Sequence, residues 1–200
     1  RQAQPTWGQR MNPRFRELIL GGELTPVGKM SGAFLAPESN LHLQFAYYQS
    51  SLVVEHLTER FGLEAIRNIL KDLGEGVEIN AAIAKHTEPL DKLEPAFRAY
   101  ATAKAKALAP ELDWTKPDPE TLRTGVEEFA KKHPKNFYLL VRQARRALND
   151  KNWEGVKAPC KELIKLFPRQ TNDDGNPYVM LARAQRELKE YQAECQTLET

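Results

Sequence analysis

Two arginines in the C-terminal half carry the clearest binding chemistry in this 200-residue chain. Arg145 and Arg183 lie 38 positions apart, each within a stretch predicted to be helical. A guanidinium group can hold a carboxylate through two parallel hydrogen bonds, so two such groups on one surface are suited to an acidic peptide. Ordinary solvated surface arginines are the alternative interpretation of the same pair.

Residues that could ligate a metal or attack a substrate are present, but their spacing fits neither role. A zinc-binding helix needs two histidines one turn apart, and Glu55-His56 has no second histidine at that distance. Cys160 and Cys195 lack a nearby histidine, and we expect buried free thiols rather than a disulfide. We therefore expect no catalytic residue, metal or cofactor within this chain. The histidines considered are His42, His56, His86 and His133.

The two arginines belong to a longer internal repeat. The same shift of 38 positions places Ala144 on Ala182 and Trp153 on Tyr191. A small residue within one helix, followed nine positions later by an aromatic residue at the start of the next, is typical of a helix-turn-helix repeat unit.

Two prolines indicate a repeat with a slightly shorter period. Pro134 and Pro168 lie 34 positions apart, each ends a helix-like run, and 34 residues is the tetratricopeptide period. On these marks, residues 117–200 resemble tetratricopeptide repeats, which implies helix pairs in a right-handed α-solenoid. The chain departs from the family at Glu194, where a small residue is usual, and at Ala147, where a large aromatic is common. A generic array of helical hairpins is the alternative.

The resemblance also implies a concave groove lined by the first helix of each pair. Arg145 and Arg183 would then face one ligand, so the expected partner is a protein or peptide, with an acidic tail as one such ligand. The implied lining residues are Tyr138, Val141, Arg145, Asn149, Asn176, Val179, Arg183 and Arg186.

The first half carries a second resemblance, in LQFAYYQSSLVVEHLTERFGLEAIRNILKDLGEG and the later LEPAFRAY. These segments resemble the helical tail of peptidase MA-like (gluzincin) metallopeptidase domains. In that family an H-E-x-x-H helix and a later Glu bind zinc, and both would lie upstream of Arg1. The resemblance implies that Tyr47 or Tyr48 lines the catalytic cleft of the longer, intact protein. The alternative is that both tyrosine rings are buried in the hydrophobic core.

Two functions follow from these resemblances. The chain is expected to be a non-catalytic, protein- or peptide-binding fragment of a larger tetratricopeptide repeat protein. The alternative is the C-terminal portion of a zinc metallopeptidase, in which the repeats select or position substrates and only the longer protein carries zinc. The start at Arg1, without a methionine, favours a fragment. Compartment and oligomeric state stay open.

Helix-forming runs separated by proline and glycine fill the chain, so we predict an all-α fold. We expect a helical domain over residues 1–110, a proline-rich linker over 111–119 and repeats over 120–200. A third possibility is a purely structural helical solenoid over residues 1–200, which fits the proline-rich stretch around Trp114 less well. Individual helices are expected over 41–61, 63–73 and 120–132, with Gly62 between the first two. The apolar face expected of residues 63–73 consists of Leu63, Ile66, Ile69, Leu70 and Leu73.

Net charge and hydropathy argue against two classes of partner, nucleic acid and the membrane interior. With 29 basic and 27 acidic residues the net charge is +2, and no dense run of lysine and arginine suggests nucleic acid. No apolar stretch approaches the roughly 18 residues of a membrane span.

Overall fold

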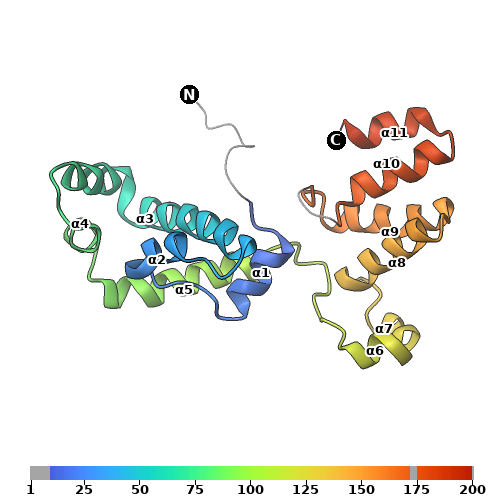
Figure 1. The fold of residues 1–200 in the computed structure, drawn as a ribbon, viewed down its shortest axis with the longest axis horizontal. Coiled ribbons are helices and arrows are strands. Elements are labelled where there is room, and N and C mark those ends of the chain that lie inside the picture. The colour runs from blue at the N-terminus through green and yellow to red at the C-terminus, as the bar shows by residue number, and fades with distance from the viewer. Residues whose placement is uncertain (1–9, 172–174, 200) are drawn as a thin grey trace. The chain divides into compact units, whose positions relative to one another are not determined.

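The computed structural model describes residues 10–171 and 175–199, and its regular elements are all helices (Figure 1). The all-α prediction is confirmed. The chain divides into two compact units, Arg1–Leu108 and Ala109–Thr200. The first unit contains α1 (Pro13–Leu20), a 3₁₀ turn η1 (Val27–Lys29), α2 (Met30–Leu35), α3 (Asn40–Gly74), α4 (Ile79–His86) and α5 (Leu90–Lys106). The second contains α6 (Pro119–Thr124), α7 (Val126–Lys132), α8 (Phe137–Asn149), α9 (Trp153–Leu166), α10 (Pro177–Glu187) and α11 (Tyr191–Leu198).

Short polar side chains cap the N-termini of α8 and α9. Asn136 accepts the backbone N–H of Leu139 at 3.1 Å, and Asn152 accepts that of Gly155 at 3.0 Å. Such caps satisfy N–H groups that the first turn of a helix leaves unpaired. As a result α8 begins at Phe137, and α9 begins at Trp153, the aromatic residue that the sequence predicts to start a helix.

The long helix α3 bends at Gly62. This glycine has φ 81° and ψ 165°, a conformation that other residues adopt only with strain. The predicted division of this region at Gly62 is confirmed, although the two segments continue into one another as a bent helix.

The second segment of α3 buries only part of the face that the apolar residues predict: Ile69 is buried and Ile66 packs against the core. Leu63 and Leu70 are more than half exposed, whereas Ile69 and Asp72 are buried. Asp72 turns inward because its Oδ2 accepts hydrogen bonds from Lys85 and His86 of α4, both at 2.8 Å. These partners, Lys85 foremost, hold the pKa of Asp72 below its usual value. The ion-paired carboxylate therefore sets the orientation of the segment.

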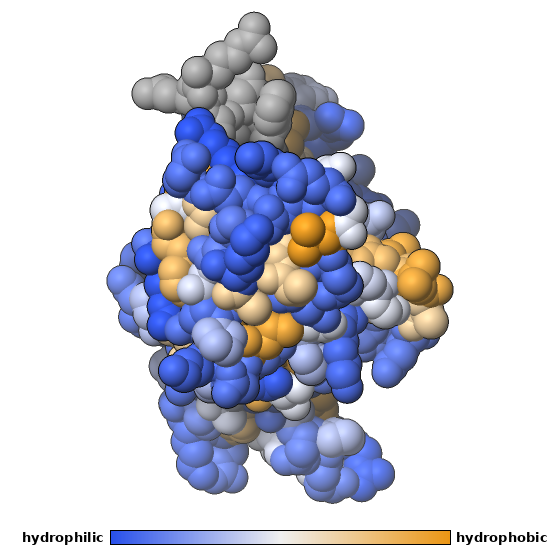
Figure 2. Space-filling model, turned by 90° about the vertical axis from the view of Figure 1, so that its left-hand side faces the viewer, coloured by the Kyte–Doolittle hydropathy of each residue, from blue (hydrophilic) through white to orange (hydrophobic). Residues whose placement is uncertain are grey.

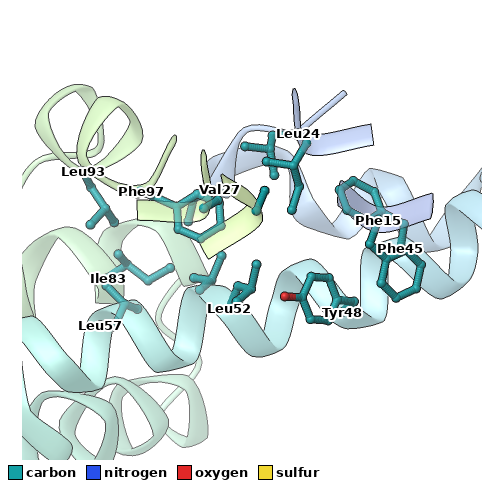
Figure 3. Close-up of a cluster of buried hydrophobic side chains, with 14 of the residues drawn as sticks. Phe15, Leu24, Val27, Phe45, Tyr48, Leu52, Leu57, Ile83, Leu93 and Phe97 are labelled. Atoms are coloured by element: carbon teal, nitrogen blue, oxygen red, sulfur yellow. The ribbon is translucent and has the colours of Figure 1, made fainter. Parts of the chain in front are cut away.

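Aromatic rings from α1 and α3 form one end of the core in the first unit (Figure 3). Phe15 stacks on Tyr48 with ring centroids 4.9 Å apart and lies 5.6 Å from Phe45. At the other end, Leu93 and Phe97 of α5 reach the same cluster from across the unit. The three helices α1, α3 and α5 thus share one apolar interior.

A buried amide ties the turn before η1 to α3. Gln49 has no exposed surface, and its Oε1 accepts the backbone N–H of Thr25 at 3.1 Å. Its Nε2 donates to the carbonyl of the same residue, Thr25. Both polar groups of one extended residue are therefore satisfied by one side chain.

The proline-rich residues 111–119, where the sequence predicts a linker, fold onto the second unit. Asp113 accepts the backbone N–H of Phe137 at 2.9 Å, and its own N–H donates to Lys135 at 3.0 Å. The Trp114 ring lies 4.7 Å from that of Phe137. The segment is anchored because its tryptophan covers the start of α8.

The single helix expected over residues 120–132 is interrupted. Gly125 ends α6 and precedes α7, with φ −116° and ψ 13°. Glycine within a helix loses more backbone entropy than alanine, which favours a break at this position.

Exposed apolar side chains of the first unit are dispersed. The face of the molecule in Figure 2 is largely hydrophilic, with separate hydrophobic patches between the charged side chains. Single exposed apolar residues are normal on a protein surface.

Replacing the buried amide should weaken the first unit. In Gln49→Leu the N–H and carbonyl of Thr25 lose their partners, which should cost about 2 kcal/mol of stability. Hydrogen exchange should show faster exchange of the Thr25 amide, together with a lower melting temperature. The control Gln44→Leu changes an exposed glutamine on the same helix and should leave both unchanged. Equal behaviour of the two variants would refute the assignment.

The stability of the first unit should also fall in mild acid. His56 is buried beside Phe97 and Tyr100, and burial lowers its pKa below the ordinary 6.5. The unfolded chain then binds a proton more readily than the folded one, so stability falls as pH drops from 6.5 through the folded pKa. Hydrogen exchange of α3 peptides should show this loss, and His56→Phe should flatten it. The control His133→Phe lies in the other unit and should preserve it.

Candidate functional site

The helices α8 to α11 form two antiparallel hairpins, and α10 contacts α8 as well as α9 (Figure 1). Small or compact side chains fill the contact between α8, α9 and α10. Ala144 of α8 and Val156 and Cys160 of α9 have no exposed surface and share a cluster with Ala184 of α10. Short side chains let helix backbones approach closely, and α8 and α10 are in contact.

The eight residues predicted to line a groove lie on these two helices and differ in exposure. Arg145 and Asn149 of α8 are exposed, as are Val179 and Arg183 of α10. The remaining four include the partly buried Tyr138, Val141 and Asn176 and the exposed Arg186. We use the name arginine surface for the exposed faces of α8 and α10 that carry Arg145 and Arg183.

Arg145 lies against the end of the loop that leads into α10. A Cβ atom placed on the buried Gly175 would lie 3.6 Å from Arg145 Nη2 and 3.3 Å from Val141 Cγ1. Gly175 therefore lies close to α8, and Val141 is the neighbour that a larger residue at this position would crowd most. No carboxylate among the described residues pairs with Arg145.

Arg183 is held by an aromatic ring. Its guanidinium carbon lies 6.0 Å from the centroid of Trp153, the residue that begins α9. A cation over the face of a tryptophan gains about 0.5–1 kcal/mol at an exposed site, which restricts the side chain without neutralising its charge. Within residues 10–171 and 175–199, Arg183 has no acidic partner.

Two of the predicted lining residues are engaged in holding the hairpins together. Asn176 caps α10 by accepting the backbone N–H of Tyr178 at 2.9 Å. Arg186 donates from Nε to Glu194 Oε1 at 2.7 Å, linking α10 to α11. This ion pair accounts for the burial of Glu194, a position where the resemblance to tetratricopeptide repeats would imply a small residue.

The tyrosines considered as a cleft wall differ in environment. Tyr48 is buried in the core, and this burial raises its pKa well above the ordinary value. Tyr47 is 57% exposed and meets the edge of Phe34 with ring centroids 5.0 Å apart.

The histidines and cysteines occupy separate places. His86 binds Asp72, His133 binds Asp113, and His42 contacts Ser39 at 2.8 Å and Glu23 at 3.1 Å. In the described ranges no group of three or more His, Cys, Asp or Glu side chains is arranged to hold a metal ion.

Both cysteines are free thiols, as predicted, but only one is buried. Cys160 lies in the hairpin cluster, where burial raises its pKa to about 12 and so disfavours the reactive thiolate. Cys195 is exposed on α11.

Sequence reasoning missed a hollow between α9, α10 and α11. Two lysines and an isoleucine on one side of α9, Lys161, Ile164 and Lys165, form part of its lining. Their spacing of three and four residues was visible in the sequence, but the facing residues of α10 and α11 are brought together only by the fold.

Loss of the Arg186–Glu194 ion pair should destabilise the second hairpin. Arg186→Met leaves the buried carboxylate of Glu194 without its partner, so the melting temperature of the second unit should fall. The double change Arg186→Met/Glu194→Ala removes the unpaired charge and should recover part of the loss. Thermal unfolding followed by tryptophan fluorescence measures both, and a double variant no more stable than the single one would contradict the ion pair's role.

No helix in the described ranges combines the length and apolar character needed to cross a membrane. No protein-family model, curated protein or solved structure gives a significant match to this chain.

Proposed function

We propose that the second unit is a recognition module that binds a protein or peptide through the arginine surface. The observation that carries the proposal is that Arg145 and Arg183, 38 positions apart in the sequence, are exposed on α8 and α10, which are in contact. Both are exposed, and neither is neutralised by an acid in the described ranges. On this proposal residues 120–200 are tetratricopeptide-like repeats in a right-handed α-solenoid.

The ligand chemistry follows from the side chains. A guanidinium binds a carboxylate in a planar, two-bond geometry, so two of them suit an acidic peptide segment better than a neutral one. The stacking of Arg183 on Trp153 supports the proposal because a restrained fork loses less entropy when it binds.

Uncharged neighbours would supply the rest of the contact. Val179 is 57% exposed beside Arg183 on α10, and Asn149 lies one helical turn beyond Arg145 on α8. An apolar side chain and an amide next to a cation allow a surface to select a ligand by both its charge and its shape. In a longer protein with a peptidase domain, as the first unit's resemblance implies, this surface would select or position substrates.

The test is binding of a short, extended Glu-rich peptide, labelled with a fluorophore and followed by anisotropy. Arg145→Ala/Arg183→Ala should weaken binding about tenfold or more, because two charge-assisted contacts are lost. A second peptide carries glutamine in place of every glutamate. Its affinity for the wild type should be as low as the affinity of the Glu-rich peptide for the double variant.

The matched control is Arg146→Ala/Arg169→Ala, which removes the same charge from exposed positions outside the arginine surface. It should retain wild-type affinity apart from a small general effect of net charge. If both double variants lost affinity equally, non-specific attraction would account for binding and the proposal would be wrong.

A further inference from the structure

The second unit carries a hollow distinct from the arginine surface. It has a volume of about 420 Å³, is open to solvent and is formed where α9, α10 and α11 meet. None of its lining residues belongs to the predicted groove, and no acidic side chain of the described residues lines it. We call it the lysine hollow; its lining residues are Lys161, Ile164, Lys165, Tyr178, Leu181, Gln185, Ala193, Gln196 and Thr197.

The floor of the lysine hollow is apolar and held in place. Leu181 is buried, and Tyr178 is fixed by the hydrogen bond from its hydroxyl to the carbonyl of Pro168 at 2.8 Å. At the α10–α11 side, the hydroxyl of Thr197 donates to Gln185 Oε1 at 2.9 Å. Because these polar groups are already engaged, the floor can accept an apolar side chain without leaving them unsatisfied.

The rim of the hollow is cationic. Three lysines of α9 follow one another at intervals of four residues, and the first is neutralised: Lys157 binds Glu190 at 2.6 Å and Glu154 at 3.1 Å. The next two, Lys161 and Lys165, are exposed and pair with no carboxylate in the described part of the chain. The hollow therefore combines an apolar floor with two charges that the protein does not compensate.

The open shape of the hollow indicates the kind of occupant. A small-molecule site usually buries roughly 70–90% of its ligand, whereas this hollow is open to solvent. A polypeptide segment can lie across α9 to α11 and extend beyond the hollow. Lys161 and Lys165 lie one turn apart, about 6 Å along α9, which matches two carboxylates one turn apart on another helix.

We propose that the lysine hollow is a second docking site, which binds an acidic amphipathic helix. An apolar side chain of that helix enters the floor at Ile164 and Leu181, and carboxylates one turn apart pair with Lys161 and Lys165. The site is independent of the arginine surface, so the module can engage two segments at once.

The experiment uses a labelled helical peptide with Glu, Leu and Glu at positions i, i+3 and i+4 of each repeat. Wild type should bind this peptide, and Lys161→Glu/Lys165→Glu should weaken binding about tenfold or more. The same variant should gain affinity for a peptide in which lysine replaces each Glu. Serine in place of leucine should weaken binding to wild type, because the floor is then left empty.

Two control variants show whether binding depends on the lysine hollow itself. Lys131→Glu/Lys135→Glu makes the same change of charge at exposed lysines elsewhere in the unit and should bind like wild type. Arg145→Ala/Arg183→Ala should also bind like wild type, so failure of the arginine surface would leave this test intact. Should the reversed-charge variant fold poorly, Lys161→Gln/Lys165→Gln provides a milder replacement. Unchanged affinity in the lysine variants, or equal binding of acidic and basic peptides to wild type, overturns the proposal.

Discussion

The close contact between α8 and α9 is the constraint on which the second unit depends. Ala144, Val156 and Cys160 are fully buried at this contact, and a larger side chain at position 144 would separate the helices. Met180 and Ala184 of α10 join the same cluster. The positions of α8, α9 and α10 thus depend on a few compact side chains in the interior of the unit.

Buried polar groups determine how several elements are oriented. Gln49 holds the turn at Thr25, Asp72 fixes the second segment of α3 on α4, and Glu194 joins α11 to α10 through Arg186. Each of these groups is costly to bury alone and is satisfied by a specific partner. These polar contacts specify one orientation of each element, whereas apolar contacts alone would permit several orientations.

The cations of the second unit divide into two kinds. Arg186 and Lys157 are neutralised by glutamates and hold α11 against its neighbours. Arg145, Arg183, Lys161 and Lys165 are exposed and have no acidic partner in the described ranges. The first kind stabilises the hairpins, and the second gives the module its two proposed contacts with acidic ligands.

The sequence by itself determined the helical class, the division at Gly62 and the start of α9 at Trp153, because caps, glycines and apolar spacing act over a few residues. It also indicated that Arg145 and Arg183 are equivalent. Only the tertiary structure decided that Asp72 rather than Leu70 faces inward, that residues 111–119 fold onto α8 and that Arg186 is engaged by Glu194. These outcomes depend on partners distant in the chain or across a turn, and local spacing carries no information about which polar groups meet.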